Sequence, residues 1–298
     1  MPQPRPVTSI RAASRAVLRV GGTIAASVER YTGGDPFAEV VTEDGGLLPY
    51  AKKHIGDLRF ADLEAQVAMD AHPVLLRWIR DAWFGNPNRD RVSLDTLDAG
   101  GAQSIELANA RIRQVVLPAL DTGSREKRLL TLRIAPRGVR RNPRPAPPVL
   151  DRTERDCLAH NFSVTLEGLD CSGVISVDSL AVETRFKEER GGRSSLLVFP
   201  DIHLHVDAER ADPFREWFED FVIAGHNDDD RERDGSIAYL DPMLGDPLAV
   251  LQLRHVGIYR VADEPASGSV RVDLYCERME LGSGAPSGDT DQVPPVKV

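Results

Sequence analysis

The two halves of the chain repeat one pattern of residues. Residues 62–83 read DLEAQVAMDAHPVLLRWIRDAW, and residues 201–222 read DIHLHVDAERADPFREWFEDFV. The segments align without a gap at a spacing of 139 positions, which pairs Trp78 with Trp217. Because a repeated segment indicates a repeated structural unit, the sequence predicts that both halves adopt the same fold.

Shorter matches extend this repeat in both directions. They pair residues 17–22 with 164–169, 92–98 with 236–241, and 128–134 with 269–276. The matched segments are rich in apolar residues at alternate positions, which is typical of strands. The repeat therefore covers most of each half and not only the tryptophan segment.

The spacing of apolar residues predicts a strand and then a helix in each copy. The strands are indicated by alternating apolar positions, Leu63, Ala65 and Val67 in one copy and Ile202, Leu204 and Val206 in the other. Pro73 is expected to begin the first helix, and Asp212 followed by Pro213 gives an N-cap and first turn for the second. Further alternating stretches follow, including residues 105–116 and 250–259. The predicted fold class is mainly β with one helix per domain, as two tandem antiparallel β-barrel or sandwich domains.

Proline and low-complexity segments set the expected domain boundaries. We expect a disordered N-terminal segment over residues 1–14 and a first domain over 15–135. Residues 136–155 contain many prolines and arginines, which favour a linker. The second domain is expected over 156–281, and residues 282–298 are expected to form a disordered tail.

Composition excludes several classes of protein. The 298 residues include 37 Lys and Arg against 46 Asp and Glu, a net charge of −9, so nucleic acid is not an expected partner. No run approaches the ~18 apolar residues of a membrane helix, so membrane insertion is not expected, and the first residues lack the apolar stretch of a secretory signal. Three widely spaced cysteines argue against a disulfide scaffold. These features predict a chain that is cytoplasmic when synthesised.

One strand carries four potential metal ligands at alternate positions, Asp201, His203, His205 and Asp207. A period of two places them on one face, where two imidazoles and two carboxylates could bind zinc or a similar ion. The alternative is an ordinary polar sheet face. The first copy has Glu64 and Gln66 at the histidine positions, so the repeated fold does not require a metal, and we expect no metal or cofactor.

Other motifs do not indicate catalysis. Residues 228–230 are three aspartates, but the spacing and closing glutamate of an EF-hand are not all present, so a polar loop is expected. Cys157 and His160 are close in sequence at the end of the linker, where packing is a better interpretation than a nucleophile pair. We expect no catalytic or cofactor-binding residues, and therefore a protein that is not an enzyme.

An ordered series of segments resembles phage tail tube proteins of the T4 type and the tube subunits of contractile injection systems. In the first half it comprises residues 52–69, the tryptophan helix and residues 115–134. In the second half it comprises residues 161–180, 199–206, 212–225 and 270–281. The resemblance implies a β-barrel with a flanking helix, six of which close into a ring around a channel, and it implies no catalytic residues.

This chain differs from a simple tube subunit because it carries two such domains. We therefore expect a trimer that forms a pseudo-hexameric ring or tube segment of a phage-tail-like particle. Its expected partners are other copies of itself, other tail, baseplate or sheath proteins, and a protein cargo. Two alternatives remain open: a baseplate or hub adaptor, or protein-binding module, that does not form a tube, and a metal-dependent enzyme built on His203 and His205. Residues 58–69, 195–207 and 247–260 are expected to be long strands whose edges pair with neighbouring subunits.

Overall fold

The structure is a computed structural model. It describes residues 15–44, 50–85, 91–98, 101–147, 156–189, 192–243 and 247–283. The segment predicted to be disordered at residues 1–14 lies outside this part of the chain, as do residues 148–155 of the predicted linker and residues 284–298 of the predicted tail.

The described residues of the first half form eleven strands and one helix, if the short β9 and the linker strand β11 are included. In chain order they are β1 (Arg15–Val20), β2 (Thr23–Thr32), β3 (Pro36–Glu43), β4 (Lys52–Phe60), β5 (Leu63–Ala68), α1 (Pro73–Trp83), β6 (Val92–Asp98), β7 (Gly101–Ala108), β8 (Arg111–Leu117), β9 (Leu120–Asp121), β10 (Leu129–Ala135) and β11 (Gly138–Pro143).

The second half is built from fewer and longer strands. They are β12 (Phe162–Leu166), β13 (Val174–Val177), β14 (Leu180–Glu189), β15 (Gly192–Val198), β16 (Ile202–Asp207), α2 (Asp212–Phe218), β17 (Arg233–Leu240), β18 (Pro247–Glu264) and β19 (Ser269–Ser283). A π-helical turn, Glu219–Ile223, continues α2, and short 3₁₀ turns lie at Ala208–Arg210 and Asp229–Arg231. The predicted fold class, mainly β with one helix in each half, is confirmed.

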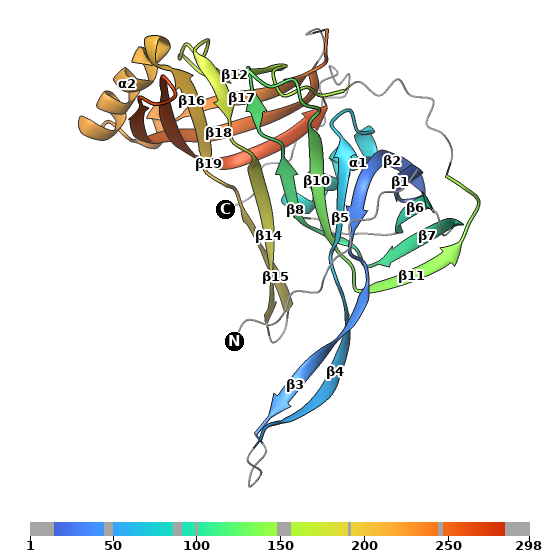
Figure 1. The fold of residues 1–298 in the computed structure, drawn as a ribbon. Coiled ribbons are helices and arrows are strands. Elements are labelled where there is room, and N and C mark those ends of the chain that lie inside the picture. Colours follow the sequence, from blue (N-terminus) through green and yellow to red (C-terminus); the bar gives the residue numbers. More distant parts are fainter. Residues whose placement is uncertain are drawn as a thin grey trace.

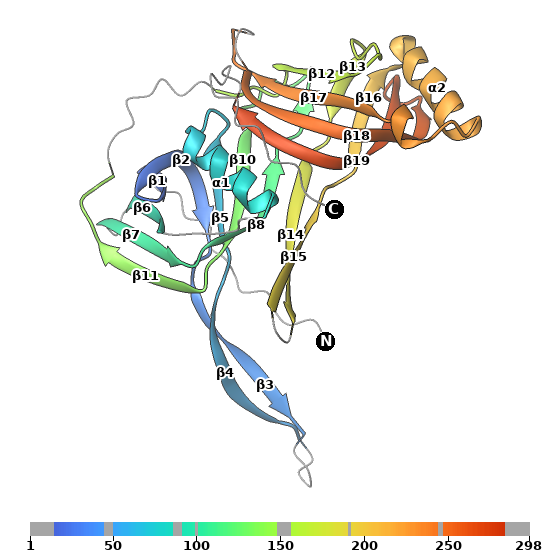
Figure 2. The same ribbon diagram turned by 180° about the vertical axis from the view of Figure 1, so that it is seen from behind.

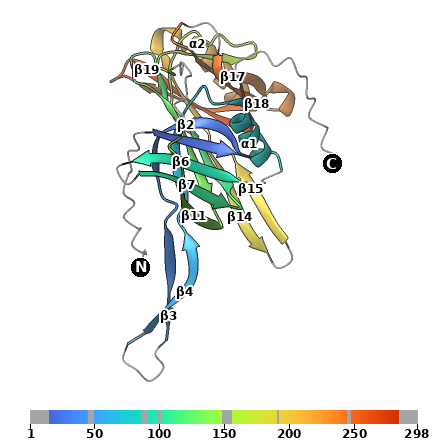
Figure 3. The ribbon, with the colours of Figure 1, turned by 90° about the vertical axis from the view of Figure 1, so that its right-hand side faces the viewer.

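Two large antiparallel sheets and one hairpin make up the molecule (Figure 1). The ten-stranded sheet has the order β11-β7-β6-β1-β2-β5-β10-β8-β14-β15, and the seven-stranded sheet has the order β12-β17-β18-β19-β16-β13-β9. Each sheet thus includes strands from both halves of the chain. Strands β3 and β4 form a separate hairpin that extends away from the rest of the molecule, on the side toward which β14 and β15 also extend (Figures 1 and 3).

Most strands of the two halves pair in the same order and register, although the β1–β2 ladder has no counterpart between β12 and β13 in the described residues. Leu132 of β10 lies opposite Ala65 of β5, and Val272 of β19 lies opposite Leu204 of β16. The pairing of β1 with β6 matches that of β12 with β17, and the pairing of β6 with β7 matches that of β17 with β18. The long strands β18 and β19 correspond to two pairs of strands in the first half. The first part of β18 and the end of β19 match β7 and β11, and the remainder of β18 and β19 matches β8 and β10. The sequence repeat therefore corresponds to a repeated pattern of strand pairing.

Irregular features recur at matching positions as well. The pairing of β2 with β5 shifts between Val28 and Arg30, and that of β13 with β16 shifts between Val174 and Ser176. Asn109 and His255, which lie 146 positions apart, both have positive φ, 50° and 53°. A positive φ is unfavourable for most L-residues. Shared bulges and shared strained positions are stronger evidence for a repeat than shared strands, because strands are common and bulges are specific.

Three strand predictions need correction. The alignment of residues 17–22 with 164–169 is displaced by one position, because Leu18 pairs with Leu94 as Val164 pairs with Ile237. Residues 58–69 and 195–207 are not single long strands, since β4 ends before β5 begins and β15 ends before β16 begins. The stretch 105–116 is likewise split into β7 and β8, whereas its counterpart is the continuous strand β18.

Both helices begin close to the predicted residues but with different caps. The imidazole Nδ1 of His72 accepts a hydrogen bond from the Val74 backbone N–H at 3.2 Å and caps α1, a role that the sequence analysis missed. In α2, Ala211 is the N-cap and Asp212 is the first helical residue, so the prediction that Asp212 caps this helix is wrong. Pro213 still lies in the first turn, where its missing N–H costs nothing.

The helices bury their tryptophans against the sheets. Trp78 and Trp217 are 4% and 5% exposed, so both are core residues, as the sequence analysis predicted. The Trp217 ring packs edge-on against Phe221, and Trp83 packs in the same way against Phe199 of the second half, each with ring centroids 6.1 Å apart. Such pairs add about 0.5–1.5 kcal/mol beyond the burial of apolar area. Helix α1 therefore helps to hold the two halves together (Figure 2).

The predicted linker and tail both contain strand residues. Within the linker, β11 pairs with β7 at the edge of the ten-stranded sheet, a strand that the sequence analysis missed. Its proline, Pro143, is the last residue of an edge strand, where a missing N–H does not break a ladder. At the other end, β19 continues through Gly282 and Ser283, which are the first two residues of the predicted disordered tail.

Candidate functional site

Strand β16 has one apolar face and one polar face, as its alternating sequence predicts. Ile202, Leu204 and Val206 are fully buried on the core side. His203 and His205 lie on the other side, with side chains that are 30% and 22% exposed. The neighbouring strand β19 contributes charged residues to the same face because its register places Asp273 opposite His203 and Arg271 opposite His205.

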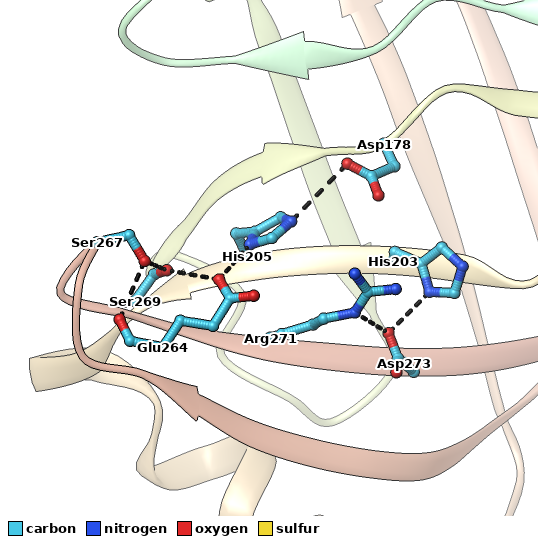
Figure 4. Close-up of polar contacts among 8 residues, drawn as sticks. All are labelled: Asp178, His203, His205, Glu264, Ser267, Ser269, Arg271 and Asp273. Carbon is cyan, nitrogen blue, oxygen red and sulfur yellow. Dashed lines mark hydrogen bonds and ion pairs between the residues drawn. The ribbon is translucent and has the colours of Figure 1, made fainter.

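Asp273 is the centre of one polar network on this face (Figure 4). Its Oδ1 lies 2.7 Å from the His203 Nδ1 and accepts a hydrogen bond from the Arg271 Nε, also at 2.7 Å. The carboxylate is 3% exposed, whereas its two partners are about one-third exposed. Burial opposes ionisation, but the hydrogen bonds from Arg271 and His203 outweigh it and hold the pKa of Asp273 below its ordinary value.

His205 belongs to a second network at the end of β18 (Figure 4). Its Nδ1 lies 2.9 Å from a Glu264 carboxylate oxygen, and its Nε2 lies 3.8 Å from Asp178. Ser269 donates to the same Glu264 oxygen at 3.1 Å. Burial opposes the ionised form of Glu264, yet the bonds from His205 and Ser269 keep its pKa below the usual range. Each histidine is thus bonded to its own carboxylate.

The structure does not gather the four sequence candidates into one ligand cluster. Asp201 accepts a hydrogen bond from the Tyr259 hydroxyl at 3.1 Å, and Asp207 accepts one from the Glu209 N–H at 3.0 Å and so caps a 3₁₀ turn. Among the described residues, no three of these side chains bring ligand atoms within 4.8 Å of one another. The geometry fits a polar sheet face held by hydrogen bonds between strands.

A different cluster has closer ligand spacing, and the sequence analysis missed it. Potential ligand atoms of Glu232, His255 and Glu277 lie within 4.8 Å of one another. The imidazole Nδ1 of His255 is 3.0 Å from a Glu232 oxygen, and the Tyr275 hydroxyl donates to the other Glu232 oxygen at 2.6 Å. These contacts already occupy both oxygens of the buried carboxylate. The three residues are more than 20 positions apart in sequence, so only the strand register brings them together.

A cavity of about 840 Å³ next to β1, β6, β7 and β11 has four arginines in its lining, Arg19, Arg91, Arg140 and Arg144. Two of them, Arg19 and Arg144, share the single negative charge of Asp95, which is 3% exposed. The Asp95 carboxylate accepts hydrogen bonds from Arg19 at 2.7 Å, Arg144 at 3.3 Å and Ser104 at 2.6 Å. The positive charge of this cavity is therefore partly used to hold strands of the first half together.

The remaining sequence motifs have structural roles. Cys157 is 1% exposed, and burial raises the pKa of its thiol to about 12, so the thiolate that a nucleophile needs does not form near neutral pH. The nearby His160 ring bonds the Ser124 backbone carbonyl at 3.1 Å. The aspartates at 228–230 lie in an exposed polar loop, as expected, and this loop contains the short 3₁₀ turn Asp229–Arg231.

The junction between the two halves is made by strand addition. Strand β14 of the second half pairs with the edge strand β8 of the first half, from Leu180 opposite Leu117 to Glu183 opposite Gln114. The Gln114 amide donates to the Glu183 carboxylate across this junction at 3.0 Å. In the opposite direction, β9 of the first half pairs with β13 of the second. The second half thus completes a sheet of the first through its own hairpin.

In comparisons with known proteins, no protein-family model and no curated protein sequence matched the chain. Within the described residues, neither helix has the length and apolar character needed to cross a bilayer.

Proposed function

We propose that the protein is a structural subunit of a phage-tail-like particle, in which three chains supply six repeats to one ring or tube segment. The observation that carries this proposal is the junction between the halves, where β14 of one repeat extends the sheet of the other. Such a contact is head-to-tail, because one repeat donates the hairpin and the other repeat provides the sheet edge that accepts it. Head-to-tail contacts between similar units form closed rings when the rotation closes.

The polar outer faces of both sheets support a water-filled channel or rim. Across β5 and β10, Arg133 donates to Glu64 at 3.0 Å, and the Gln114–Glu183 bond continues this polar surface over the junction. The second sheet has a polar face of its own around Asp273. An antiparallel sheet with one apolar and one polar face is suited to a wall with core on one side and water on the other.

The resemblance of the sequence to T4-type tail tube proteins supplies the biological context of the proposal. Proteins of the tail, the baseplate or the sheath would then be partners at the upper and lower faces of the ring, and a protein cargo would occupy the channel. The role is mechanical, without catalysis or a cofactor. A hub or adaptor position within the same kind of particle is the second form of this proposal.

The native mass of the purified chain tests the proposal. One chain has a mass of 32.7 kDa, and we expect an assembly of three chains at micromolar concentration, measured by native mass spectrometry and light scattering. A stable monomer at that concentration would contradict the ring and would favour an adaptor that binds other proteins as a single chain.

A further inference from the structure

The contact between the two halves provides a template for contacts between chains. It has a donor, the β14–β15 hairpin, and an acceptor, the edge of β8. Because both repeats share their strand pairing, each half should contain both parts. The donor of the first half and the acceptor of the second half then remain to be identified.

The β3–β4 hairpin is the counterpart of the β14–β15 hairpin. Phe37 lies opposite Arg59 in the first hairpin, and Glu183 lies opposite Val198 in the second. Phe37 precedes Glu183 by the same 146 positions that separate the bulges of β2 and β13, and Arg59 precedes Val198 by the 139 positions of the tryptophan repeat. The two hairpins therefore match in register as well as in their place in the fold.

The counterpart of β8 is the C-terminal part of β18. The pairing of β8 with β10 shifts register at Arg133 and Ile134, and the pairing of β18 with β19 shifts at the matching place, between Ile258 and Arg260. This alignment equates Gln114 with Arg260 and Val115 with Val261. The strand β18 is thus the acceptor edge of the second half.

This acceptor edge is open in the described part of the chain. Strand β17 pairs with β18 only as far as Val256, and residues 257–264 form ladder contacts with β19 alone. Burial reflects the difference between the two edges. Val115, beneath β14, is 0% exposed, whereas its counterpart Val261 is only partly buried. An open strand edge of this kind is a template for pairing with another chain.

The donor hairpin is also uncovered and exposes apolar side chains. It forms a two-stranded sheet of its own, and two-stranded sheets are marginally stable in water without further support. Four of its apolar side chains are strongly exposed: Phe37 at 42%, Val40 at 53%, Ile55 at 75% and Leu58 at 65%. Exposed apolar residues gathered on one element indicate an interaction surface.

We infer that β3 of one chain adds to the open edge of β18 in a second copy, antiparallel, with Phe37 opposite Arg260 and Pro36 opposite Val261. This inference rests on the proposed function and names the strands that join its subunits. The Arg260 side chain is 62% exposed although its Nη1 lies 3.8 Å from the Asp273 carboxylate, so its guanidinium can stack on the Phe37 ring. Pro36 has no backbone N–H, so this ladder has one potential donor fewer than the ladder of β14 with β8.

Disulfide trapping between two chains tests this register. A chain with Phe37→Cys is mixed under mild oxidation with a chain of different length that carries Arg260→Cys. We expect a covalent heterodimer on a non-reducing gel, because side chains opposite each other in antiparallel strands have Cβ atoms about 4.5–5.5 Å apart. The matched control is Arg254→Cys, because Arg254 is also an exposed arginine on β18. It is six residues from Arg260, which at ~3.3 Å per residue is about 20 Å along the strand.

The outcomes separate the inference from the proposed function. Cross-linking at 260 but not at 254 supports the inference. A native mass of three chains without the 37–260 cross-link would overturn the inference and leave the ring intact. A monomeric mass without the cross-link would overturn both. Wild-type protein oxidised in parallel accounts for the native thiols, of which Cys157 and Cys276 are buried.

Discussion

Replacing Asp273 by Asn tests the energetics of the polar face on the second sheet. The substitution keeps the shape of the side chain but removes the charge that accepts hydrogen bonds from Arg271 and His203, each at 2.7 Å. A hydrogen bond to a charged group contributes about 1.5–3 kcal/mol. Because both partners are about one-third exposed, water replaces part of each interaction, and we expect a net loss of about 2 kcal/mol in the free energy of unfolding.

The loss of stability in Asp273→Asn should also depend on pH. The pKa of Asp273 is lower in the folded protein than the 3.8 of the free carboxyl, so ionised Asp273 favours the folded state. Its contribution is complete above the unfolded pKa and is lost as the pH falls through the folded pKa. The difference between wild type and Asp273→Asn should therefore be present near neutral pH and should shrink below pH 3.8.

Urea unfolding followed by circular dichroism, at one fixed protein concentration, measures this difference. The matched control is Asp263→Asn, which removes a carboxylate that is 62% exposed and pairs with Arg215 at the surface. Exposed pairs contribute roughly 0–1 kcal/mol, so the control should change little. A loss at Asp273 no larger than at Asp263, or one that persists unchanged below pH 3.8, would refute the role given to this network.

Three further predictions concern packing and backbone. Gly235→Ala should lower the free energy of unfolding by about 1–3 kcal/mol, because the added Cβ would lie 2.2 Å from the Thr165 backbone oxygen. Gly138→Ala is the control and should be tolerated, because its Cβ meets only the Ala108 Cβ at 3.4 Å. Thermal unfolding compares the two variants. Asn109→Ala should lower the free energy of unfolding by about 1 kcal/mol, because Asn109 has a φ of 50°. Asn109→Gly should lower it clearly less, since glycine adopts positive φ readily. Equal losses of the two variants in urea unfolding would argue against a backbone cause. Cys157 should resist iodoacetamide at pH 8 in the native protein and react after unfolding, because its thiol is buried with a pKa of about 12; rapid labelling of native protein, located by peptide mass mapping, would contradict this burial.

The repeat and the identity of the main strands were predictable because they depend on local patterns. Alternation over residues 63–67 and 202–206 marks a strand with one buried face, and the tryptophans mark the apolar side of each helix. The sheet edge that β14 joins was not predictable in the same way. Its residues favour a strand, but strand propensity does not specify which edge the strand joins.

The polar networks were only partly predictable for a related reason. The sequence placed His203 and His205 on one face correctly, but their partners Asp273 and Glu264 come from strands about 60–70 residues away. The cluster of Glu232, His255 and Glu277 depends on the positive φ at His255 and on the register of β18 with β19, neither of which leaves a local pattern. The one-residue error in aligning 17–22 with 164–169 has a similar origin, because the spacing of the repeat is not constant. It is 146 positions before the β3–β4 hairpin and 139 just after it, since Phe37 and Arg59 are seven positions further apart than Glu183 and Val198.

Electron microscopy of the purified chain tests whether its repeats assemble head-to-tail. We expect annular particles with three-fold symmetry and six similar lobes, in which the spacing between lobes is the same within a chain and between chains. Single two-lobed particles at micromolar concentration, or rings whose lobes meet through surfaces other than the hairpins and sheet edges, would contradict it.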